Sequence, residues 1–135
     1  MNLKGNFQGT HIISVSMVEL MDKMVSHKYG EFKQEQTEYY QNKLRKKIFW
    51  LVLYTDKNTK DDFENIDVVK YHENLLSEIS SYNELLFYPK DFVEIINTLE
   101  QALSILKSDN FDFIRYKKLV FDAGALMQRL KVGDE

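Results

Sequence analysis

Apolar residues recur along most of this chain with the period of an α-helix. At 100° per residue, apolar side chains gather on one side of five segments, residues 10–29, 31–55, 63–87, 89–107 and 110–132. Each amphipathic helix must bury its apolar stripe, and short connections make successive helices antiparallel neighbours. The pattern therefore predicts an all-α fold, an antiparallel (up-and-down) bundle of four to five helices, as a single domain over residues 1–135.

The residues between the segments supply the expected helix boundaries. Pro89 suits a first helical turn, where a missing N–H costs nothing, and Gly30 and Gly133 are expected to end two helices. The expected N-terminal caps are Asp61 or Asp62 for the third segment and Asn110 for the fifth.

Two stretches also fit a strand. Residues 11–18 contain a β-branched, partly alternating run, and residues 49–54 read FWLVLY, which is rich in aromatic and β-branched side chains. A lone strand at 49–54 would have few partners in a helical chain, so we expect a helix there. Both alternatives remain open at this point.

The stretch 48–54 (IFWLVLY) is apolar on every side of a helix, which is typical of a fully buried segment. A small bundle rarely surrounds one helix completely, so the excess apolar surface needs a cover: the N-terminal arm, a second copy of the chain or a partner protein. Phe49, Trp50 and Leu53 are the candidate interface, since aromatic residues dominate such contacts. The fifth segment carries a weaker second apolar strip, made of Ile114, Phe121 and Ala125.

Composition narrows the classes of function. The absence of cysteine excludes disulfides, thiolate nucleophiles and Cys-ligated metals, and one proline with five glycines is too few for a turn-rich β-protein. The longest apolar run has seven residues, and no secretory signal is recognisable, so we expect a cytoplasmic protein without a membrane span. Frequent Lys, Asn, Ile and Tyr indicate an AT-rich bacterial or phage genome.

The densest charge of one sign is the basic cluster of Lys43, Arg45, Lys46 and Lys47. Such a cluster can contact phosphates of a nucleic acid. These four charges point to different sides of a helix, however, and the chain has a formal charge of −3. A solvated helix surface is the favoured interpretation, with phosphate contacts as the alternative.

His72 lies in the apolar arc of the third segment. It is either a metal ligand or general base, or a buried polar residue bonded to a backbone carbonyl or a tyrosine. No second ligand stands at helical spacing from it, so we favour the buried polar interpretation and expect no metal and no cofactor.

None of the common catalytic motifs occurs in the chain. The leading hypothesis is therefore a non-catalytic helical-bundle protein with a regulatory or accessory role, whose partner is another protein or a second copy of the chain. A nucleic-acid-associated accessory protein that uses the basic cluster is the first alternative. A metal- or ligand-binding bundle centred on His72 is the second.

Overall fold

The computed structural model describes residues 24–130, and all structural statements below concern these residues. They form a β-hairpin followed by four α-helices, with one short 3₁₀ helix between the first two of these helices. The elements are β1 (Met24–His27), β2 (Gly30–Lys33), α2 (Gln34–Thr55), η1 (Lys60–Phe63), α3 (Val68–Leu85), α4 (Lys90–Leu106) and α5 (Phe113–Arg129).

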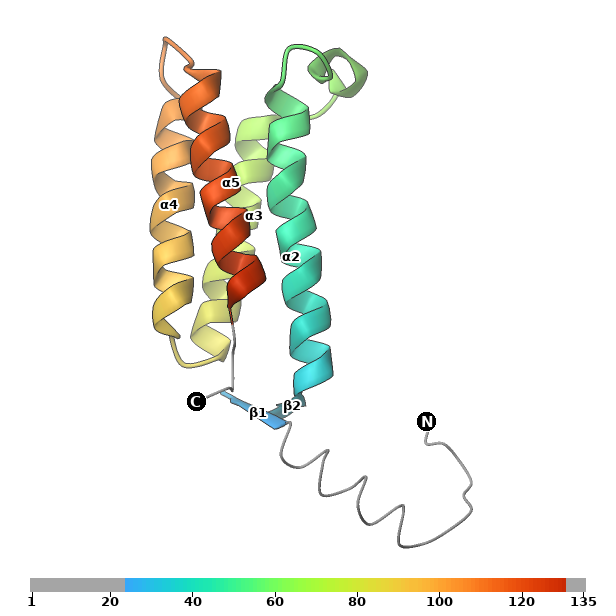
Figure 1. Ribbon diagram of the computed structural model, residues 1–135, viewed down its shortest axis with the longest axis vertical. Helices are drawn as coiled ribbons and strands as arrows, with labels where there is room; N and C mark the ends of the chain where they lie inside the picture. Colours follow the sequence, from blue (N-terminus) through green and yellow to red (C-terminus); the bar gives the residue numbers. More distant parts are fainter. Residues whose placement is uncertain (1–23, 131–135) are drawn as a thin grey trace, which may run out of the picture.

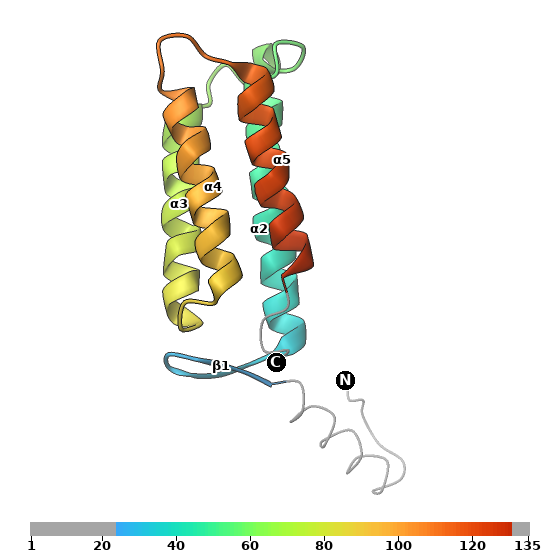
Figure 2. The ribbon, with the colours of Figure 1, turned by 60° about the vertical axis from the view of Figure 1, so that its left-hand side comes forward.

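The helices lie side by side, and each runs opposite to the one before it, while the hairpin crosses the end at which α2 begins (Figures 1 and 2). Helix α5 packs against both α4 and α2, and α3 packs against α4 and α2. The space between them is filled by one apolar core to which all four helices contribute. The predicted helical class is confirmed, and the hairpin is an addition to it. In the described part of the chain, every helix is too short or too polar to cross a membrane.

The hairpin corrects the predicted helix over residues 10–29, which is wrong from residue 24 onward. Strands β1 and β2 pair antiparallel, from Met24 opposite Lys33 to His27 opposite Gly30. Gly30 does not end a helix. It opens β2 with a φ of 147°, a conformation that glycine adopts without steric cost. The expectation for residues 11–18 lies outside the described residues.

A tertiary contact explains why the chain turns here. The backbone N–H of Lys28 donates to the carbonyl of Leu85 over 2.8 Å, and its ammonium group pairs with Glu84 over 3.2 Å. Both partners lie at the end of α3, and the Val25 side chain is buried in the core. These contacts outweigh the weak local preference for continuing a helix.

The predicted caps of two helices are also wrong. The carboxylate of Asp67, instead of Asp61 or Asp62, accepts from the Lys70 N–H over 3.1 Å and begins α3. The Asp112 carboxylate accepts from the Arg115 N–H over 3.1 Å and begins α5, two residues after Asn110. Each side chain satisfies a backbone donor that the first helical turn leaves free.

Helix α3 ends two residues earlier than expected, because Phe87 and Tyr88 both adopt left-handed conformations with φ of 66° and 58°. A helical conformation is disfavoured directly before Pro89. Left-handed backbone costs about 1–2 kcal/mol per non-glycine residue. The turn thus carries strain, and both aromatic side chains are exposed.

Candidate interaction face

Residues 49–54 are helical, as expected, and continue α2 to its end at Thr55. Burial along this stretch is uneven. Leu51 and Val52 are buried, whereas Phe49 is 46% exposed and Trp50 is 39% exposed. The expectation that the stretch is buried on every side is therefore wrong for these two aromatic residues, because the other helices cover only part of the circumference of α2.

Phe49 and Trp50 face different neighbours. The Trp50 ring lies 5.7 Å from that of Tyr54 and 5.8 Å from that of Phe63 in η1. Tyr54 in turn packs edge-on against Tyr71 of α3 at 5.1 Å. The segment around η1 thus covers part of Trp50 from within the chain, so the candidate interface predicted from the sequence divides into two parts.

Phe49 meets α5 instead. Its ring stacks on that of Phe121, with 6.2 Å between the ring centroids, and both rings remain about half exposed. Leu53 follows Phe49 by one helical turn and is partly buried, while Ile114 stands two turns before Phe121 and is 80% exposed. Together with Lys117, these residues form a surface that we call the α2–α5 face: Phe49, Leu53, Ile114, Lys117 and Phe121.

A cation lies over the aromatic part of this face. The Lys117 ammonium group is 5.9 Å from the ring centroid of Phe121 and equally far from that of Phe113. Lys46 is exposed one turn before Phe49, and Lys118 pairs with Asp122 over 3.2 Å. The face therefore has an apolar centre and a mainly basic border, an arrangement that attracts carboxylates.

The four residues of the predicted basic cluster do not act as one charged patch. Lys47 pairs with Glu78 of α3 over 2.9 Å, and the Arg45 guanidinium donates to Asn42 over 2.8 Å. Lys43 and Lys46 are both exposed, and the ammonium group of Lys43 lies 5.8 Å from the Tyr39 ring centroid.

His72 is fully buried between three helices. Its Nε2 lies 2.8 Å from the Leu99 carbonyl, so this nitrogen carries the proton and donates. Its Nδ1 is then free to accept from the Tyr116 hydroxyl, 2.9 Å away. Burial lowers the pKa of His72, against the opposing effect of the Leu99 carbonyl. A neutral imidazole with both nitrogens occupied offers no position for a metal ion or a substrate.

Acidic and histidine side chains do not gather elsewhere in residues 24–130: no three of them lie close enough to hold a metal ion. The sequence pattern offers Lys117 only as one of several C-terminal basic residues that could extend the basic cluster, and not as part of an apolar face. Its position between Ile114 and Phe121 on the second apolar strip was the available signal, but the pattern does not tell which helix that strip meets.

No protein-family model, no curated protein and no solved structure matches this chain.

Proposed function

We propose that this chain is a non-catalytic protein that binds another protein through the α2–α5 face, in a regulatory or accessory role. The observation that supports this is the exposed pair of stacked rings, Phe49 and Phe121, contributed by two helices and extended by Ile114. Single exposed apolar residues are ordinary on a protein surface, whereas neighbouring aromatic residues from separate elements are typical of interfaces.

The border of the face indicates the chemistry of the partner. Lys117 and Lys46 favour a segment that combines apolar side chains with Asp or Glu. A two-fold contact with a second copy would bring the same lysines of both copies into one interface, which is unfavourable without added carboxylates. We therefore favour a different, acidic protein over a homodimer.

We further propose that the chain is a single domain, an antiparallel up-and-down bundle of helices, and that it works in a bacterial cytoplasm. The alternation of helix direction in Figure 1 supports the bundle.

The test uses affinity capture from the host with the wild-type chain and with Phe49→Ser/Phe121→Ser. We expect the wild-type protein to retain a partner that the double variant loses. With the purified partner, the double variant should bind at least about tenfold more weakly, as for loss of interface anchors. Added salt should weaken the wild-type complex, because Lys117 and Lys46 contribute electrostatic attraction.

Phe87→Ser/Tyr88→Ser is the matched control, because it removes two aromatic side chains that are exposed at the other end of the helices, between α3 and α4. It should bind the partner like the wild type. Equal binding by both double variants would contradict the proposal. Light scattering after size exclusion of the purified chain decides whether the partner is a different protein or a second copy of the chain. A stable dimer would point to a second copy.

Nucleic-acid binding remains the alternative prediction. Lys47 is paired to Glu78 and Arg45 is bonded to Asn42, so two of the four charges of the basic cluster already have partners. Its test is the shift of labelled DNA or RNA at about 50 mM salt, where such binding is strong.

A further inference from the structure

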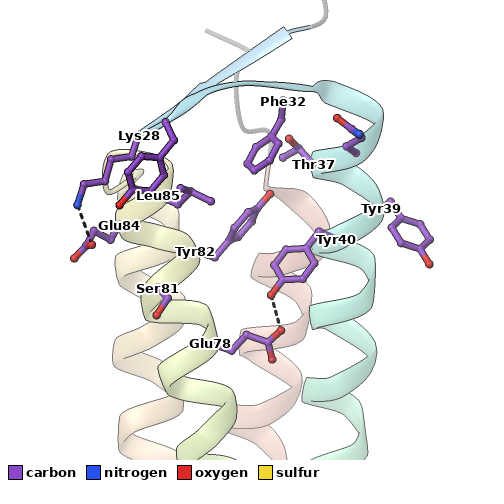
Figure 3. A pocket seen from close by; sticks show the side chains of 12 residues that line it. Lys28, Phe32, Thr37, Tyr39, Tyr40, Glu78, Ser81, Tyr82, Glu84 and Leu85 are labelled. Atoms are coloured by element: carbon purple, nitrogen blue, oxygen red, sulfur yellow. Dashed lines mark hydrogen bonds and ion pairs between the residues drawn. The ribbon is translucent and has the colours of Figure 1, made fainter.

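A pocket of about 840 Å³ lies between the hairpin and the halves of α2 and α3 that are nearest to it (Figure 3). We call it the hairpin pocket. Its volume lies within the range of small-molecule sites in proteins. None of the residues of the α2–α5 face lines it, so it is a separate site.

Aromatic rings form much of the pocket wall. Tyr40 of α2 and Tyr82 of α3 meet edge to face at 4.7 Å, and Phe32 of β2 lies above them (Figure 3). Leu85 and the two exposed tyrosines Tyr29 and Tyr39 complete the apolar part of the lining. Rings on several sides suit a ligand that itself contains a ring, which they can contact edge-on or by stacking.

The charged groups at the pocket are already paired. The Glu78 carboxylate accepts from the Tyr40 hydroxyl and from Lys47, and Glu84 pairs with Lys28. The two hydrogen bonds hold the pKa of Glu78 below its usual value, although burial acts to raise it. Each charged group that lines the pocket thus already has a partner of opposite charge, so the pocket favours a neutral ligand.

In contrast to these charged groups, the hydroxyl of Tyr82 has no hydrogen-bond partner among the described residues. The Tyr82 side chain is nonetheless more than nine-tenths buried. The hydroxyl points into the space below Phe32 and Thr37 (Figure 3). Thr37 is the nearest polar neighbour and acts to lower the pKa of Tyr82, but its hydroxyl, which donates to the Lys33 carbonyl, does not meet the Tyr82 hydroxyl in hydrogen-bonding geometry. An unpaired hydroxyl in the core is costly, so proteins rarely keep one without a use.

We propose that the hairpin pocket binds a neutral, ring-bearing small molecule with one hydrogen-bonding group, which pairs with the Tyr82 hydroxyl. The ring of the ligand lies between Tyr40 and Leu85. Its polar group reaches Tyr82 when Phe32 moves aside. Phe32 belongs to a two-stranded hairpin, which is only marginally stable by itself and is held at its far end by Lys28.

Tyr82→Phe tests this inference, because it removes one oxygen and keeps the ring. The probe is 2-naphthol, titrated into the full chain while backbone amide signals are followed by NMR. We expect saturable shifts of the Phe32, Tyr40 and Leu85 amides, and affinity about fivefold lower in Tyr82→Phe, as for one lost hydrogen bond. Naphthalene lacks the hydroxyl and should bind both proteins equally.

Tyr116→Phe is the control, since it removes a buried tyrosine hydroxyl outside the pocket, and it should keep the wild-type affinity for 2-naphthol. The absence of saturable shifts at the pocket amides would overturn the inference, as would unchanged 2-naphthol affinity in Tyr82→Phe. Phe49→Ser should bind 2-naphthol normally, so failure of the protein-binding proposal and failure of this inference are distinguishable.

Discussion

Two tyrosines of the same core contrast in what their hydroxyls contact. Tyr116 on α5 and Tyr82 on α3 are both buried, and burial raises the pKa of each, to about 12 for Tyr82. Both therefore remain neutral hydroxyls at physiological pH. The Tyr116 hydroxyl donates to His72, whose other nitrogen donates to Leu99, so every polar atom of this group has a partner.

The Tyr82 hydroxyl has no hydrogen-bond partner within residues 24–130 and lies beside the hairpin pocket. A satisfied buried polar group stabilises the fold and specifies how its helices pack. An unsatisfied one costs free energy of folding. The contrast indicates that the region around His72 serves the fold, whereas the region around Tyr82 is available for binding.

The largest expected effect on stability comes from removing the hydrogen bonds of His72 to Tyr116 and Leu99. His72→Leu removes both hydrogen bonds and leaves the Tyr116 hydroxyl unpaired in the core, so we expect a loss of about 3 kcal/mol in the free energy of unfolding. Urea denaturation measures it. His72→Gln is the control, since its amide can still donate to the Leu99 carbonyl, and it should lose less. Wild-type stability in His72→Leu would mean that the hydrogen bonds of His72 do not stabilise the fold.

A smaller effect is the pH dependence that His72 imposes. Its pKa lies below the unfolded value of 6.5, because the buried imidazole resists protonation. Its contribution to stability is therefore complete above about pH 6.5 and is lost as the pH falls toward the folded pKa. The charged groups near it, Glu73 and Lys107, form an ion pair at 2.9 Å and have opposing effects on this pKa.

The free energy of unfolding, obtained from urea denaturation between about pH 7 and about pH 5, should therefore decrease in the wild-type protein, by at most about 1.4 kcal/mol per pH unit from this residue. His72→Gln should show a shallower decrease over the same range. Parallel curves for the two proteins would contradict a buried, neutral His72.

Some elements of the fold could be predicted from the sequence, and others could not. The apolar stripe of residues 89–107 located α4 within one residue at each end, because its periodicity reflects burial on a single side. The hairpin was not predictable in the same way. Residues 24–27 continue a helical stripe, and the contacts that hold them as a strand come from Glu84 and Leu85, distant in sequence.

The candidate sites likewise combine features that the local sequence pattern predicts with features that depend on tertiary packing. The sequence indicated that Phe49 belongs to an excess of apolar surface, and that Ile114 and Phe121 form a second strip. Phe49 meets this strip only because α2 packs against α5 in a particular register, which the sequence pattern does not reveal. The Tyr82 hydroxyl gives no sequence signal, since its lack of a partner depends on where three separate elements place their polar atoms.

The most direct test of the contrast compares Tyr116→Phe with Tyr82→Phe by urea denaturation of the full chain without ligand. Tyr116→Phe should lose about 1–2 kcal/mol, because it leaves the His72 Nδ1 unpaired. Tyr82→Phe should lose nothing and gain up to about 1 kcal/mol, because it removes an unsatisfied buried hydroxyl. Equal losses in the two variants would show that the Tyr82 hydroxyl has a partner in the folded chain, and would contradict the account of the hairpin pocket.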